Sequence, residues 1–179
     1  MTSPCDPQNA PVGDVATAIM IIDSKIAAVH SDTPGPDPEL GALADQFTAS
    51  VSAEEAEDVL DGACTLIYVF MKWLRECYEA HDQEVIEAVV PHLVATMRRM
   101  PKSVPPEAIP TMAGLVIAAG NGLSPGLWRA QYGEWTEAEM TPLEATAFLL
   151  AEHINRIADD DHTFATRMVT DALTSLEEA

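Results

Sequence analysis

The chain has 179 residues and a formal net charge of -20, and 47% of its residues are hydrophobic and 21% are charged. This composition is typical of globular proteins and limits the classes of protein to which the chain can belong. The composition excludes an intrinsically disordered chain, and the acidity argues against direct binding of nucleic acid or of an anionic membrane, because both need clustered Lys and Arg. We therefore expect a folded protein with an acidic surface.

The N-terminal segment and the cysteines indicate a cytoplasmic protein. Residues 1–11 are rich in proline but contain neither a basic residue nor an apolar run, which predicts a disordered tail and no secretory signal. Cys64 and Cys77 fall in one expected helix and lie about 20 Å apart, which is too far for a disulfide. We therefore expect reduced thiols, as in the cytoplasm.

Apolar residues recur at helical spacing, and the alternation typical of strands hardly occurs. Between Val12 and Val29 the apolar positions lie three and four residues apart, which predicts a helix with one apolar stripe. That stripe would pack in the core or, alternatively, form the seam of a homodimer. Segment 31–38 is rich in Pro and Gly and ends this helix. Asp37 and Pro38 then predict the start of a second helix.

The longest expected helix starts at a capping box, Ser52 with Glu55, and runs to about His81. Its wide apolar face predicts a central position in the fold. We expect Asp82 to cap the helix that follows. Pro91 lies in the middle of that helix and should kink or break it.

A proline-rich stretch from Pro101 to Pro110 is the clearest internal boundary, although both sides are too apolar to be independent domains. It precedes an Ala-rich segment, residues 111–119, which is apolar throughout and predicts a buried helix. Ser124 and Pro125 predict the cap and the first position of a short helix.

Two capping boxes, Thr136–Glu139 and Thr141–Glu144, precede the last two expected helices. Taken together, the elements predict an all-α fold. We expect a single-domain bundle of about seven or eight helices over residues 12–179, with one long central helix.

Positive charge is concentrated in a central band of this acidic chain. Residues 88–133 have a net charge of +3, from Glu107 and the four cations Arg98, Arg99, Lys102 and Arg129. Such a band is where an anion or another acidic surface would dock. Two structural alternatives remain: cations that complement a helix dipole, or an ion-pair seam between acidic helices.

Aromatic residues cluster beside one of these cations. Trp128, Tyr132 and Trp135 lie within eight positions of one another, next to Arg129. Aromatic and arginine clusters are typical of interface anchors, and ordinary core packing is the alternative. Ser124 adds the N-terminus of a short helix, whose free amide groups would suit a carboxylate or a phosphate.

No pattern of catalytic or cofactor-binding residues occurs in the sequence. The histidines form neither a Glu-x-x-His pair nor a zinc-protease pair, and Gly-rich phosphate loops are missing. His92 is interpreted as a packing or capping residue. The acidic clusters at 57–61 and 159–162 are interpreted as solvated residues at helix ends rather than as metal ligands. We therefore expect no metal and no cofactor.

These observations favour a non-catalytic cytoplasmic protein that binds another macromolecule, a protein, through the region from Arg98 to Trp135. The alternative is a small all-helical enzyme or ligand-binding protein with an anion-accepting pocket near Arg129. Both hypotheses require the cations of the central band to converge on a patch that water reaches.

Overall fold

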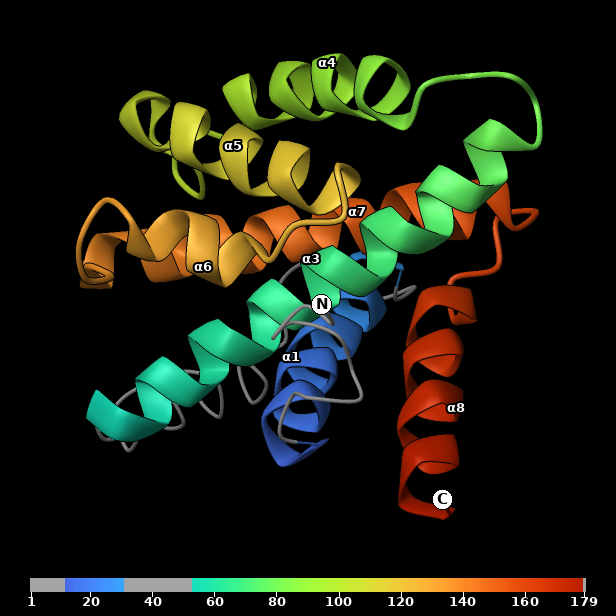
Figure 1. Ribbon diagram of the computed structural model, residues 1–179, viewed down its shortest axis with the longest axis horizontal. Helices are drawn as coiled ribbons and strands as arrows, with labels where there is room; N and C mark the ends of the chain where they lie inside the picture. The colour runs from blue at the N-terminus through green and yellow to red at the C-terminus, as the bar shows by residue number, and fades with distance from the viewer. Residues whose placement is uncertain (1–11, 31–52, 179) are drawn as a thin grey trace.

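The computed structural model describes residues 12–30 and 53–178, and every regular element in these ranges is a helix (Figure 1). Its α-helices are α1 (Val12–His30), α3 (Ala53–Glu79), α4 (Val85–Arg98), α5 (Ile109–Gly120), α6 (Pro125–Ala130), α7 (Met140–Ile157) and α8 (Phe164–Glu178). Two short 3-10 helices are η1 (Pro106–Ala108) and η2 (Glu137–Glu139). The predicted all-α class is confirmed. The predicted tail, the helix predicted at Asp37 and the Ser52 cap lie outside the described residues.

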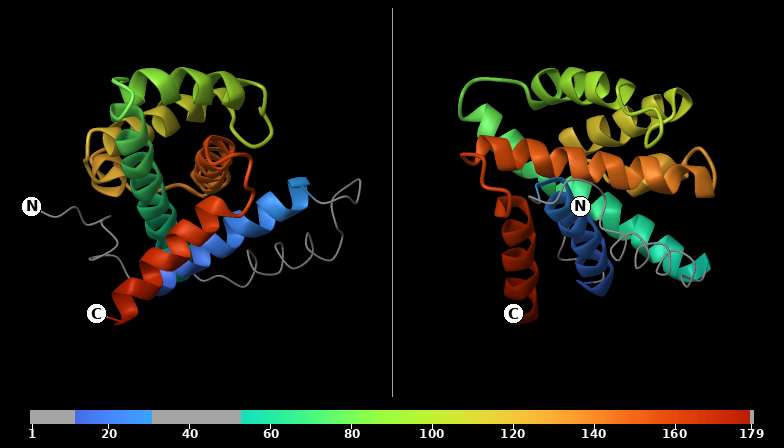
Figure 2. Two further views of the ribbon diagram at one scale, coloured as in Figure 1. Left: turned by 90° about the vertical axis from the view of Figure 1, so that its right-hand side faces the viewer. Right: turned by 180° about the vertical axis from the view of Figure 1, so that it is seen from behind.

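The helices pack in a bundle in which several elements are buried. Helix α3, with 27 residues, is the longest described helix and contacts every other described α-helix. Helix α7 is seen nearly end-on in the left view of Figure 2, with α3, α4 and α5 around it. Helices α1 and α8 lie side by side on one side of the bundle, and α4 and α5 pair on the other (Figure 1). A single central helix is not clearly distinguished, because α5 and α7 are also buried along much of their length.

The apolar stripe of α1 packs against α3 of the same chain. Four of its residues are nearly inaccessible to water: Val15, Ile19, Ile22 and Ile26. Gly62 permits the close approach of the two helices, because a Cβ there would overlap the carbonyl oxygen of Asp14. The stripe does not extend to Val29, which is 62% exposed. At this end a polar contact replaces apolar packing: Nε2 of His30 lies 3.0 Å from a carboxylate oxygen of Glu152 on α7.

Helix α4 differs from the expectation at its start, and its proline does not divide it into two helices. Glu84, with extended backbone, occupies the N-cap position that was predicted for Asp82. Asp82 instead has a φ of 56° in the turn after α3, a left-handed conformation that Asp tolerates. Pro91 does not break α4, which continues to Arg98. The buried row on α4 holds it in place despite the lost hydrogen bond; this row comprises Val85, Val89, Leu93 and Met97.

The caps predicted between α5 and α7 are confirmed in two of three cases. The hydroxyl of Ser124 accepts a hydrogen bond from the backbone N–H of Leu127 at 3.2 Å, so it caps α6. The Thr136–Glu139 capping box is formed at η2. The second predicted box is wrong, because α7 already begins at Met140 and Thr141 lies within its first turn.

Candidate functional site

Arg129 lies near the C-terminal end of α6 and is buried, with 6% of its surface exposed. Its guanidinium donates two hydrogen bonds to the carboxylate of Glu139, one of them from Nε to Oε2 at 2.8 Å. Two further hydrogen bonds reach the carbonyl oxygens of Gly133 (3.0 Å) and Glu134 (3.1 Å). The ring of Trp135 lies against the guanidinium, with its centroid 4.9 Å from the central carbon. Through these hydrogen bonds, Arg129 therefore holds the segment between α6 and α7 in a fixed conformation.

The ion pair between Arg129 and Glu139 stabilises the charged forms of both side chains. The hydrogen bond to Glu139 raises the pKa of Arg129, and the same contact is the main cause of the lowered pKa of Glu139. An external anion at Arg129 would have to displace a carboxylate that already occupies the guanidinium. The anion-accepting position that the sequence suggested here is thus taken by a residue of the chain itself.

The aromatic residues of the predicted site divide into packed and exposed members. Trp128 packs on α5, where a Cβ on Gly114 would overlap its ring. Tyr132 is 70% exposed, and its ring centroid lies 5.3 Å from that of Trp128. Trp135 is half-buried beside Arg129. Among these aromatic side chains, Tyr132 is the one that a partner could reach most fully.

The other cations of the predicted site lie at the C-terminal end of α4 and in the turn after it. Arg98, Arg99 and Lys102 are exposed, and none of them forms an ion pair with a described residue. Arg98 lies in the last turn of α4, where a cation complements the helix dipole. The cations of the central band do not form one accessible patch, because Arg129 is buried while these three are in solvent.

Sequence reasoning missed an exposed apolar surface next to the predicted site. Seven large hydrophobic side chains of the described residues are exposed, and four of them lie between positions 117 and 132, on α5, on α6 or beside α6. We refer to these four as the α5–α6 surface. They are Ile117, Leu123, Leu127 and Tyr132, with exposures of 37%, 56%, 58% and 70%. Leu123 precedes the N-cap Ser124 and Leu127 lies in the first turn of α6, so the two do not share a helical stripe that the sequence could have revealed.

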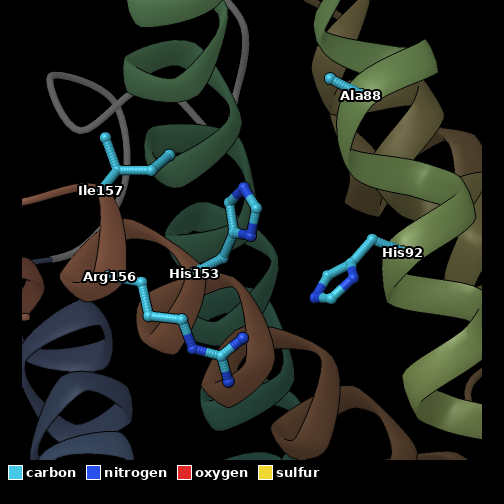
Figure 3. A pocket seen from close by; sticks show the side chains of 5 residues that line it. All are labelled: Ala88, His92, His153, Arg156 and Ile157. Carbon is cyan, nitrogen blue, oxygen red and sulfur yellow. The ribbon is translucent and has the colours of Figure 1, made fainter.

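A separate groove, the α4–α7 groove, lies between α4 and α7 (Figure 3). Its volume is about 430 Å³, and it is lined by Ala88, His92, His153, Arg156 and Ile157. The ring centroids of His92 and His153 are 5.8 Å apart. On the other side of its ring, Nε2 of His153 lies 2.9 Å from the hydroxyl oxygen of Tyr78 on α3.

A narrower cavity lies next to the α4–α7 groove and shares its two histidines. Its apolar lining comprises Val89, Leu93, Leu149 and Leu150, with Thr96 at the side of α4. The sequence offered no signal for this site, because His92 and His153 belong to helices far apart in the chain. The sequence indicated that His92 packs or caps a helix, and it did not indicate that His92 and His153 line the same groove.

Comparison with family models, with curated protein sequences and with solved structures finds no match. Among the helices of residues 12–30 and 53–178, none has the length and apolar character that a membrane crossing needs.

Asp161 belongs to the acidic cluster before α8 and forms an ion pair with Arg167. Hydrogen bonds from Thr163 are the main cause of the lowered pKa of Asp161. The α5–α6 surface and the α4–α7 groove are therefore the features from which function can be inferred.

Proposed function

We propose that this chain is a non-catalytic cytoplasmic protein that acts by binding another protein through the α5–α6 surface. The observation that supports the proposal is the exposure of Leu123, Leu127 and Tyr132, each more than half accessible to water. Large apolar side chains that meet in one exposed patch are typical of an interaction site, and the short interval that holds these residues supports such a patch. Tyrosine is also among the residue types that most often anchor an interface.

The chemistry of this surface indicates which partner it would accept. Residues 108–133 contain no acidic residue, so an acidic partner is not repelled there as it is elsewhere on a chain with a net charge of -20. Gly120 at the end of α5 lies against Ile86 at the start of α4, so the exposed cations Arg98, Arg99 and Lys102, at and after the other end of α4, lie away from Leu123. We expect a partner with an apolar centre, which supplies affinity, and with acidic groups tolerated around that centre.

The buried residues of the same region hold this surface in one shape. Trp128 packs into the space above Gly114, and Arg129 fixes the connection to α7 through Glu139. A surface that is already ordered loses less conformational entropy when a partner binds. The buried members of the predicted site thus have a supporting role, while Leu127 and Tyr132 would make the contact.

A second copy of this chain is the alternative partner. Two copies with the same large negative charge repel each other, and the acid-free α5–α6 surface is where that repulsion is smallest. The ligand-binding alternative at Arg129 has less support, because Glu139 already occupies the guanidinium.

The test is a comparison of captured proteins between the wild-type chain and the double variant Leu127→Glu/Tyr132→Ser. We expect a protein retained by the wild type from an extract of the source cells to be lost with the variant. The matched control is Met20→Ser/Val29→Ser, which removes two exposed apolar side chains on α1, 69% and 62% accessible, and should retain that protein.

Light scattering of the purified chain separates the homodimer from a different partner, since a dimer would be seen without the extract. Circular dichroism of the double variant shows whether its helices are intact. If the folded double variant captures the same proteins in the same amounts as the wild type, the α5–α6 surface is not the binding site.

A further inference from the structure

We propose that the α4–α7 groove binds a small organic anion, a carboxylate or a phosphate ester, between His92, His153 and Arg156. Three nitrogen-bearing side chains from two helices border one cavity, and no described Asp or Glu is among the residues that line it. In a chain with 29 acidic residues and nine Lys and Arg, this is an unusual local composition. The site does not depend on the α5–α6 surface.

The three side chains approach the groove from its two walls. His92 extends from α4, while His153 and Arg156 extend from the facing side of α7 (Figure 3). Both imidazole rings line the groove, and their planes are tilted by 45° to each other. Arg156 is exposed and forms no ion pair with any described residue. An unpaired guanidinium beside two imidazoles is a suitable set of donors for carboxylate or phosphate oxygens.

The contact between His153 and Tyr78 orients the imidazole towards the groove. Burial is the main cause of the raised pKa of Tyr78, so the phenol keeps its proton and can donate it to Nε2 of His153. With Nε2 accepting, the ring hydrogen of the neutral imidazole is on Nδ1. No described residue is hydrogen-bonded to Nδ1, which is thus free to donate to a bound anion.

Anion binding at this site would be coupled to proton uptake. Burial is the main cause of the lowered pKa of His153, and the nearby His92 and Arg156 lower it further. The groups that face this ring are Tyr78 from α3, His92 from α4 and Arg156 from α7 itself. The negative charge of a bound anion opposes the positive charges that lower this pKa, so the anion raises the pKa of His153 and favours the imidazolium form. Affinity should therefore increase as the pH falls below the ordinary imidazole value of 6.5.

The size and lining of the groove favour an organic anion over a bare ion. The groove is largely open to solvent, and its volume of about 430 Å³ leaves room for a small organic molecule. Ala88 and Ile157 provide apolar contact at the groove itself, and the adjoining cavity is mainly apolar. A divalent metal is disfavoured, because the guanidinium of Arg156 would lie close to it and its positive charge would repel a cation.

The experiment follows the histidine ring signals of the full chain by NMR while inorganic phosphate, succinate or Zn²⁺ is added. Phosphate and succinate distinguish the two kinds of anion, and Zn²⁺ tests the competing metal site. We expect the ring signals of His92 and His153 to shift and saturate with at least one of the two anions. Binding of succinate should be about tenfold tighter at about pH 5.5 than at about pH 7.5.

Two variants make the test specific to the groove. Arg156→Gln should weaken anion binding by about tenfold or more, because it removes the fixed positive charge. Arg98→Gln removes an exposed, unpaired cation on α4 outside the groove and should change the affinity by less than about twofold. The proposal is wrong if neither anion shifts the His153 signals, if both variants weaken binding equally, or if Zn²⁺ alone saturates the two histidines.

Discussion

Buried Arg129 and half-buried Glu139 form a doubly hydrogen-bonded ion pair that closes the connection between α6 and α7. The same carboxylate accepts a hydrogen bond from the backbone N–H of Thr136, so Glu139 is both an ion-pair partner and part of a helix cap. Helix α6 has only six residues and is too short to be stable by itself. The ion pair therefore stabilises the segment that presents Leu127.

Replacing Arg129 with Met would leave the carboxylate of Glu139 partly buried without its counter-charge. We expect the free energy of unfolding to fall by roughly 2–3 kcal/mol, measured by urea denaturation. The control is Arg98→Met, since Arg98 is exposed and has no ion pair with a described residue; its effect should stay within about 0.5 kcal/mol. Equal effects of the two substitutions would contradict a structural role for the ion pair.

The pH dependence of stability should report on the same carboxylate. The folded-state pKa of Glu139 lies below its ordinary value of 4.5, chiefly because of the hydrogen bond from Arg129. The ionised carboxylate therefore contributes its full stabilisation at pH values above the ordinary pKa of 4.5. That stabilisation is lost as the pH falls through the lower pKa of the folded state. We expect the unfolding free energies of the wild type and of Glu139→Gln to differ most near neutral pH and to converge in acid. Curves that stay parallel down to about pH 3 would rule out Glu139 as the source.

Gly114→Ala tests the packing of Trp128 on α5. The substitution raises the helix propensity of α5 by up to about 1 kcal/mol, but the new methyl group would overlap the indole ring. Displacing a ring in a packed interior costs about 1–3 kcal/mol, so we expect a lower Tm and altered tryptophan fluorescence. In a Trp128→Leu background the same substitution should cost less. Strictly additive losses would show that the two residues do not touch.

Gly62→Ala and Gly13→Ala form a matched pair for the crossing of α1 and α3. A methyl group at Gly62 meets the backbone of Asp14, which cannot rotate away, whereas Gly13 faces open space. We expect Gly62→Ala to destabilise the fold by about 1–3 kcal/mol and Gly13→Ala to be neutral or stabilising by up to about 1 kcal/mol. Hydrogen exchange of the α1 amides should accelerate in the first variant alone. Unchanged exchange in Gly62→Ala would mean that the two helices are not in close contact there.

Features that depend on neighbouring residues were predictable from the sequence. The stripe of α1, the Ser124 cap and the Thr136–Glu139 box all arise from spacing or hydrogen bonds within a few positions, and the structure has all three. The start of α4 was not predictable in the same way. Asp82 has the side chain of a helix cap, but a left-handed turn competes for the same residue, and the observed φ of 56° shows which prevails.

The sequence by itself determined that this chain is helical, acidic and folded, because periodicity, composition and charge are properties of the residues alone. Only the tertiary structure decided that Arg129 is enclosed by Glu139 rather than open to a ligand, and that Leu127 stays in solvent. It also brought His92 and His153 to one groove. These outcomes depend on how all the helices pack around a shared core, and spacing within one segment carries no information about a distant one.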